Sequence, residues 1–306
     1  MFQLRNFLYL KELHKDEINH LLDLSQSYLN PDYSSGKRSL LKNHSIANLF
    51  FEPSTRTSAS FQVAAKRLGA ESIIIDEKKS SSTKGETVLD TIKNIEAMGV
   101  RAFIIRTGDG SLFEKLIKNV KKDTCLISAG ESSVSHPTQG LLDLLTIRQE
   151  KGSFEDLKIA IMGDIAHSRV ARSLVEGLKI LETGRVVLIA PDEFEPDLKK
   201  FSNVEFTTKP EVGLCDTDVV VTLRVQKERI ASDKNSISLE DYSETYQLTN
   251  EKLNLCNQDA IVMHPGPINR GIEISNEVAD GEQSVILKQV ENGVAVRMAV
   301  LTEILK

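Results

Sequence analysis

The chain has 306 residues, 40% of them apolar, and a formal net charge of −6. This length is typical of two domains, each with enough apolar side chains for a core of its own. An acidic chain does not coat nucleic acid nonspecifically, so any anion-binding site must be a local basic pocket. Cys125, Cys215 and Cys256 are far apart and form no CxxC pair, which favours free thiols over a zinc knuckle or a disulfide framework.

The N-terminal segment MFQLRNFLYLKELHKDE carries a charge every few residues. This spacing argues against a signal peptide and against a membrane span, and it predicts an amphipathic first helix. We therefore expect a cytoplasmic protein that does not bind membranes. The one compositionally biased stretch is KKSSSTKGET, from Lys78 to Thr87.

Short apolar runs alternate with helical spacing of apolar residues along the rest of the chain, which indicates an α/β fold. Most of these runs are continuous, as in parallel strands that are covered on both faces. In chain order, the predicted strands are Ile46–Phe51, Ser72–Ile75, Ala102–Ile105, Cys125–Ser128, Lys158–Met162, Val186–Ile189, Val219–Leu223 and Ala260–Met263.

These elements predict two domains, each a doubly wound sandwich with a parallel sheet, bridged by helices. One bridging helix is expected from Thr138 to Gly152. The last helix, Gln283 to Lys306, has no strand of its own, and we expect it to pack back on the first domain. The predicted first domain is residues 1–137 plus the C-terminal helix 285–306, and the second is residues 138–284.

The first candidate site is FFEPSTRTSAS, from Phe50 to Ser60. The apolar spacing becomes helical after Ser54, so this residue and Thr55, Arg56 and Thr57 lie at a strand-to-helix turn. Free N–H groups and the helix dipole favour an anion there, and the hydroxyls and the guanidinium add donors. The stretch alone is equally compatible with an ordinary N-cap followed by a surface arginine.

Three more polar turns follow predicted strands. Arg106 ends the strand of FIIRTGDG, and His136 and Gln139 lie in SSVSHPTQG before a helix. Gly266 and Pro267 lie in IVMHPGPINRG, a rigid turn that can present backbone carbonyls. Ligands of open α/β sheets bind beyond the carboxyl ends of the strands, so we expect these turns to share one pocket.

The second half has a strand, a turn and a helix in KIAIMGDIAHSRVARSLVEGL, but Gly163 is not followed by glycines at GxGxxG spacing. Nucleotide binding there is therefore not expected. The turn instead presents Ser168 and Arg169. Arg224 ends another strand, and alternation places Gln226 on the same side. Two arginines and an amide suit a ligand with two carboxylates, although each arginine alone could be a surface residue.

Together these motifs resemble the catalytic chains of the aspartate carbamoyltransferase family along the whole sequence. The segments that carry the resemblance are, in order, FFEPSTRTSASF, STKGETVLDT, RTGDG, SHPTQGLLDLLTI, GDIAHSRVARS, LRVQKER and HPGPINRGIEI. Ornithine carbamoyltransferases share Ser-Thr-Arg-Thr and His-Pro-x-Gln but usually carry a cysteine where this chain has Pro265. LRVQKER and the KGET loop favour the aspartate enzymes.

The resemblance implies that carbamoyl phosphate and L-aspartate give N-carbamoyl-L-aspartate and phosphate, the committed step toward pyrimidines. It implies no cofactor and no metal, and a homotrimer with active sites shared between subunits. It leaves open whether regulatory chains attach.

The same resemblance implies a role for each candidate residue. Thr57, Arg106 and His136 would contact the carbonyl oxygen and serve catalysis, without a protein nucleophile. The implied carbamoyl-phosphate set is Ser54, Thr55, Arg56, Thr57, Arg106, His136, Gln139, Gly266 and Pro267. The implied aspartate set is Arg169, Arg224 and Gln226, with Lys84 donated by a neighbouring subunit.

Glu52 would act as an organiser, which the family pattern ties to Arg169 and Arg229. One competing interpretation is a carbamoyltransferase for another acceptor, such as ornithine, whose cationic side chain suits Arg224 poorly. The other competing interpretation is a homologue without catalytic activity. Loss of Arg56, Lys84, Arg106 or His136 would indicate it, but all four are present.

Overall fold

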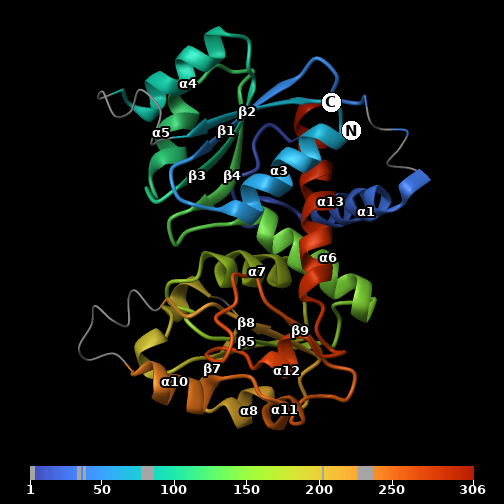
Figure 1. The fold of residues 1–306 in the computed structure, drawn as a ribbon, viewed down its shortest axis with the longest axis vertical. Coiled ribbons are helices and arrows are strands. Elements are labelled where there is room, and N and C mark those ends of the chain that lie inside the picture. The colour runs from blue at the N-terminus through green and yellow to red at the C-terminus, as the bar shows by residue number, and fades with distance from the viewer. Residues whose placement is uncertain (1–3, 33–35, 37–38, 77–85, 202, 227–236) are drawn as a thin grey trace. The chain divides into compact units, whose positions relative to one another are not determined.

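The computed structural model describes residues 4–32, 36, 39–76, 86–201, 203–226 and 237–306 (Figure 1). The chain forms two compact units: unit 1 is residues 1–145 with 291–306, and unit 2 is residues 146–290. The chain passes between the units within α6 (Pro137–Lys151) and within α13 (Ile286–Leu305). Pro137 marks the start of a helix in the sequence, whereas a change of unit inside a continuous helix has no sequence signal.

Unit 1 contains one parallel sheet in the order β2-β1-β3-β4. Its strands are β1 (Ser45–Phe50), β2 (Glu71–Asp76), β3 (Ala102–Thr107) and β4 (Cys125–Glu131). Each strand predicted in this part of the chain is therefore confirmed, with small shifts at the ends. Its helices are η1 (Leu10–Glu12), α1 (Lys15–Leu29), α3 (Thr55–Arg67), α4 (Val88–Ala97) and α5 (Leu112–Asn119), with parts of α6 and α13.

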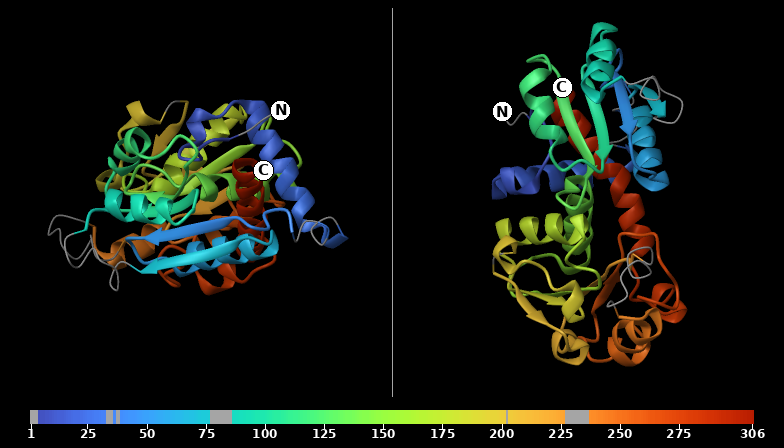
Figure 2. Two further views of the ribbon diagram at one scale, coloured as in Figure 1. Left: turned by 90° about the horizontal axis from the view of Figure 1, so that it is seen from above. Right: turned by 90° about the vertical axis from the view of Figure 1, so that its left-hand side faces the viewer.

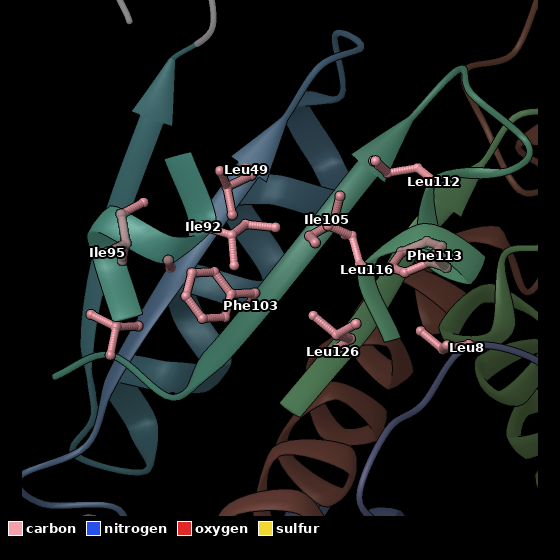
Figure 3. Packing of buried hydrophobic residues seen from close by; sticks show 12 residues of the cluster. Leu8, Leu49, Ile92, Ile95, Phe103, Ile105, Leu112, Phe113, Leu116 and Leu126 are labelled. Atoms are coloured by element: carbon pink, nitrogen blue, oxygen red, sulfur yellow. The ribbon is translucent and has the colours of Figure 1, made fainter. Parts of the chain in front are cut away.

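One face of this sheet packs against α4 and α5 (Figure 3). Phe103 and Ile105 of β3 meet Ile92 of α4 and Phe113 of α5 in a cluster of buried side chains. Burying each such side chain stabilises the fold by about 1.5–3 kcal/mol relative to leaving it exposed. Because both faces must be covered, the strands are continuous apolar runs, which is why the sequence predicted them well.

The other face of the sheet is the one on which α13 lies (Figures 1 and 2). The hydroxyls of Tyr28 in α1 and Thr302 in α13 are 2.7 Å apart. The guanidinium of Arg297 in α13 lies 5.0 Å from the ring centre of Phe61 in α3. Residues 291–306 are therefore an integral part of unit 1.

The N-terminal segment is not the predicted amphipathic helix, and α1 begins only at Lys15. Phe7 instead bridges to Ile127 in parallel, with its N–H donating to Leu126 O at 2.9 Å. Leu4, Phe7, Leu8 and Leu10 are buried, and Phe7 adds to the sheet beside its edge strand β4. Glu17 accepts from the backbone N–H of His14 at 2.8 Å, which caps the helix at its true start.

Unit 2 contains a second parallel sheet in the order β7-β6-β5-β8-β9. Its strands are β5 (Lys158–Met162), β6 (Arg185–Ile189), β7 (Glu205–Thr207), β8 (Val219–Thr222) and β9 (Ile261–Met263). Its helices are α7 (Arg169–Ile180), η4 (Asp192–Phe194), η5 (Leu198–Lys200), α8 (Pro210–Leu214), α10 (Leu239–Tyr246), α11 (Asn250–Leu253) and α12 (Asn276–Ala279). The predicted class of two α/β domains, each with a parallel sheet and flanking helices, is confirmed.

Within the described residues, no helix combines the length and the apolar character that crossing a membrane requires.

Candidate active site

The turn after β1 places the Ser-Thr-Arg-Thr cluster at the start of α3. Ser54 is the N-cap, with extended backbone angles, and its carbonyl accepts from the N–H of Ser58 at 3.2 Å. Thr57 is buried in the first turn, whereas the side chains of Thr55 and Arg56 are exposed. The predicted strand-to-helix turn is present, so the first backbone N–H groups of α3 point out of the helix beside this cluster.

Arg106 connects the ends of three neighbouring strands. It lies opposite Phe50 in the register of β1 and β3. Its Nε is 3.5 Å from Glu52 Oε2, and its Nη1 donates to Ala129 O of β4 at 3.4 Å. The strand register and these contacts place the side chain of Arg106 at the carboxyl ends of the strands.

Gly108 leaves room for Glu52 beside Arg106. A Cβ added at this glycine would lie 3.2 Å from Glu52 Oε1. A Cβ at this position would press on the carboxylate that faces the guanidinium. Local packing therefore explains why the first glycine of RTGDG, Gly108, is a glycine.

His136 and Gln139 are presented by a tight turn after β4. Glu131 N–H donates to Ser135 O at 2.8 Å, and Ser132 N–H donates to Thr107 O of β3 at 2.7 Å. His136 immediately precedes α6, and its carbonyl accepts from Gln139 N–H at 3.0 Å. Both side chains are buried, and Gln139 Nε2 donates to Asp143 Oδ1 at 3.0 Å.

Unit 1 therefore gathers its predicted residues at one edge of its sheet. β1, β3 and β4 are neighbours in the sheet and run parallel, so their carboxyl ends lie side by side. Arginine side chains, hydroxyls and a helix N-terminus at one edge suit a phosphorylated anion. Fixed donors there can also stabilise negative charge that develops on a carbonyl oxygen.

Unit 2 gathers a second group at the carboxyl ends of β5 and β8. Arg169 is the first residue of α7, and Ser168 caps that helix by accepting from Ala171 N–H at 3.1 Å. Gly163 adopts φ +133°, and a Cβ there would lie 2.9 Å from Leu223 O. The turn after β5 therefore approaches the end of β8 closely, next to Arg224.

The turn after β9 is tied to the same segment. Asn269 Nδ2 donates to Val225 O at 3.0 Å, between the half-buried Arg224 and Gln226. Gly266 has φ +65° and precedes a cis bond to Pro267.

A buried histidine supports this turn. Gly266 N–H donates to Nδ1 of His264 at 2.7 Å, and Nε2 of the same ring is 3.2 Å from Glu273 Oε1. The predicted residues of unit 2 thus follow three adjacent strands, β5, β8 and β9. Arg169 follows β5, Arg224 and Gln226 follow β8, and the backbone carbonyls of Gly266 and Pro267 follow β9.

Lys84 and Arg229 lie outside the described residues. Sequence reasoning missed Asp143, His264 and Asn269, which support predicted site residues. The four-residue spacing from Gln139 to Asp143 on one helix was a signal that could have found the first. The other two depend on contacts within an irregular turn, which no spacing rule predicts.

A hollow of about 610 Å³ lies elsewhere, lined by Lys158, Arg185, Glu211, Val212, Cys215 and Asp216. Lys158 and Arg185 begin β5 and β6, so this hollow is at the amino ends of the strands. Ligands of such sheets bind at the opposite, carboxyl ends, and we assign no function to it. In the described part of the chain, no group of three or more His, Cys, Asp or Glu side chains is placed to hold a metal ion.

Comparison with known proteins covers nearly the whole chain. Residues 5–149 match the carbamoyl-phosphate-binding domain of aspartate/ornithine carbamoyltransferases, and residues 155–304 match their aspartate/ornithine-binding domain. An aspartate carbamoyltransferase catalytic subunit from Xanthomonas campestris pv. campestris (strain B100) is 46% identical over 305 residues, which are 99% of this chain and 96% of that protein.

Solved structures agree with this match. Aspartate transcarbamoylase from Trypanosoma cruzi in complex with carbamoyl phosphate has a TM-score of 0.90 at 27% identity, covering 100% of this chain and 98% of that one. Ornithine carbamoyltransferase from Thermus thermophilus has a TM-score of 0.87 at 27% identity, covering 99% of each chain. The chain belongs to the aspartate/ornithine carbamoyltransferase family and contains both of its domains.

Proposed function

We propose that this chain transfers the carbamoyl group of carbamoyl phosphate to the amine of L-aspartate, giving N-carbamoyl-L-aspartate and phosphate. The observation that carries the proposal is the pair Arg169 and Arg224 in turns after adjacent strands of unit 2. An acceptor with two carboxylates satisfies two guanidinium groups, and Gln226 adds a neutral amide. The 46% identity to an aspartate carbamoyltransferase catalytic subunit supports the same acceptor.

In this proposal the residues of unit 1 bind carbamoyl phosphate. Ser54, Thr55, Arg56 and the N–H groups at the start of α3 hold the phosphate. Thr57, Arg106 and His136 direct donors at the carbonyl oxygen. Gln139 and the backbone carbonyls of Gly266 and Pro267 accept from the carbamoyl NH2.

The chemistry requires positioning more than a reactive side chain. The aspartate amine attacks the carbonyl carbon, the carbon–oxygen bond to phosphate breaks, and the amine proton leaves with the phosphate. Negative charge develops on the carbonyl oxygen as the tetrahedral intermediate forms. Donors that are fixed in place before the reaction stabilise that charge without reorganising.

A carbamoyltransferase for ornithine is the competing function, since the family includes such enzymes and one has a similar structure. The side chain of that acceptor ends in a cation instead of a carboxylate. A cation beside Arg224 would be repelled instead of bound. The position after His264 is also Pro265, where the ornithine enzymes usually have a cysteine.

We further propose a cytoplasmic homotrimer in which Lys84 of each subunit completes the site of its neighbour. The family resemblance supports this arrangement. A ring of identical subunits with head-to-tail contacts gives every site the same donated lysine.

The decisive assay uses purified protein, carbamoyl phosphate and either L-aspartate or L-ornithine. Release of phosphate and formation of N-carbamoyl-L-aspartate with aspartate alone is the expected result. Turnover with ornithine in place of aspartate would overturn the assigned acceptor, and no turnover with either would overturn the reaction.

A further inference from the structure

Arg297 is a charged residue in the interior of unit 1. It lies on α13 with 3% of its surface exposed, and its Nη1 donates to Gly293 O at 2.8 Å. Burial lowers the pKa of this guanidinium to about 9, and the attraction of Asp143 opposes that shift. The side chain therefore stays protonated at neutral pH, and its buried charge needs an anionic partner.

Gly293 of α13 has no side chain, which leaves room for the guanidinium of Arg297. A Cβ added at Gly293 would lie 2.7 Å from Arg297 Nη1 and 3.2 Å from Leu142 Cδ2 of α6. No other residue type fits at Gly293 without displacing Arg297. α13 thus has a gap at the level where α6 carries Leu142 and, next to it, Asp143.

Asp143 is the acid whose charge acts on Arg297, and it also contacts the candidate site. It is fully buried, and its Oδ1 accepts from Gln139 Nε2 at 3.0 Å, one turn earlier on α6. A carboxylate has no N–H or O–H to donate, so only the NH2 end of the Gln139 amide can face it. The carbonyl end, Oε1, must then point the other way.

We propose that Asp143 and Arg297 are positioning residues that fix the orientation of the Gln139 amide and so make it an acceptor for the carbamoyl NH2. The inference rests on the proposed function, in which Gln139 contacts that group. Without a carboxylate at position 143, the amide could turn over and present its own NH2. Two NH2 groups would then face each other, and the contact would be lost.

This arrangement makes the chain selective for a carbamoyl group over an acyl group. Acetyl phosphate has a methyl where carbamoyl phosphate has NH2, and the two share the phosphate and the carbonyl. The Oε1 acceptor of Gln139 distinguishes them, whereas the arginines and the α3 N-terminus do not. The ratio of the two affinities therefore reports on the acceptors of the carbamoyl NH2, and the change in this ratio on substitution of Asp143 reports on the Gln139 amide.

The experiment compares the intact protein with Asp143→Asn, which keeps the shape of the side chain but can donate as well as accept. We would measure the Kd of carbamoyl phosphate and of acetyl phosphate by calorimetry. The expected result is a preference for carbamoyl phosphate that falls roughly three- to tenfold in the variant, the effect of one lost hydrogen bond. Equal weakening of both ligands, or an unchanged ratio, would overturn the proposal.

Further variants separate positioning from a general loss of structure. In a Gln139→Ala background, Asp143→Asn should leave the ratio unchanged, because the residue through which it acts is absent. Gly293→Ala places a Cβ against Arg297 and keeps the side chains of Asp143 and Gln139 in the sequence, and it should lower the ratio in the same direction. The exposed Asp123→Asn, which only loses an ion pair with Arg101, should leave the ratio at the wild-type value.

If Asp143→Asn does not fold, the double variant Asp143→Asn with Arg297→Met removes both buried charges together. It should fold and still show the reduced ratio, and a wild-type ratio in it would refute the inference. A wild-type protein that does not turn over carbamoyl phosphate with aspartate defeats the proposed function. An active wild type whose ratio survives these substitutions defeats only the role of Asp143 and Arg297.

Discussion

Arg224 lies two residues after the end of β8 and is half-buried, and Asn269 contacts the next residue by donating to Val225 O. Replacing Arg224 with alanine removes a charge-assisted contact to the proposed acceptor. Such a loss is about 1.5–3 kcal/mol, or roughly 10- to 150-fold in kcat/KM for aspartate. Steady-state kinetics with each substrate varied in turn would measure it.

Arg185→Ala is the matched control. Arg185 belongs to the same unit, but it pairs with Glu205 at the exposed amino ends of β6 and β7. Its loss should leave both kinetic constants near wild type. If Arg224→Ala weakened carbamoyl-phosphate binding as much as aspartate use, the assignment of Arg224 would be wrong.

Glu131 gives a prediction on pH and stability. Burial raises the pKa of this carboxyl, and the hydrogen bond from Tyr9 Oη at 2.8 Å opposes the shift. The folded state therefore binds the proton more tightly than the unfolded state, whose pKa is roughly 4.3. The stabilisation that protonated Glu131 contributes is fully present below the unfolded-state pKa. It is lost as the pH rises through the higher pKa of the folded state.

Glu131→Gln removes the titration and keeps an acceptor for Tyr9. Its free energy of unfolding, relative to wild type, should rise between pH 4 and pH 7.5. Urea unfolding of both proteins at several pH values would measure this difference. A difference that falls as the pH rises would contradict the direction assigned to the Glu131 pKa.

At the scale of elements, the contact between the turn after β5 and the end of β8 can be tested through Gly163. Alanine there must adopt φ +133°, and its Cβ would lie 2.9 Å from Leu223 O. We expect a loss of about 1–3 kcal/mol in stability, with a rise in KM for aspartate because Leu223 precedes Arg224. KM for carbamoyl phosphate should change less.

Gly152→Ala controls for backbone strain, since Gly152 has φ +77° with no atom within 4 Å of an added Cβ. It should cost about 1–2 kcal/mol and leave both KM values unchanged. Equal kinetic effects of the two variants would mean that the approach to Leu223 does not position Arg224.

The elements also show what the sequence could and could not predict. The strands of both units were predictable because burial on both faces makes them continuous apolar runs. β7 was missed because it is three residues long and only Phe206 in it is strongly apolar. The N-terminal segment was misassigned because its partner, Ile127, lies far along the chain.

The candidate site, too, was predictable only in part from the sequence. Ser54, Arg106 and Arg224 were predictable because each lies at the end of an apolar strand or a few residues beyond it. The Arg297 and Asp143 pair was not, because a charge within an apolar helical run gives no sign of what it faces in the folded unit.

At the scale of the whole molecule, the proposed sharing of sites can be tested with two variants, Lys84→Ala and Arg56→Ala. Each should be nearly inactive alone. When the two are dissociated, mixed equally and reassembled, roughly a quarter of the sites should regain both residues in a head-to-tail ring. Phosphate release by the mixture measures this recovery.

The outcome depends only on which subunit supplies Lys84. A lysine that served its own subunit would leave no intact site in any mixture. Mixed trimers with no more than the parents' residual activity would therefore refute the sharing.

Unit 1 is discontinuous along the chain, and this affects how the protein is made. All residues of unit 2 leave the ribosome before residues 291–306, the last part of unit 1. Until these residues emerge, the nascent first half lacks Thr302 beside Tyr28 and Arg297 beside Phe61. Several apolar residues of this last stretch are buried in the folded chain, so we expect unit 1 to complete its core only after they emerge, although most of its residues are made first.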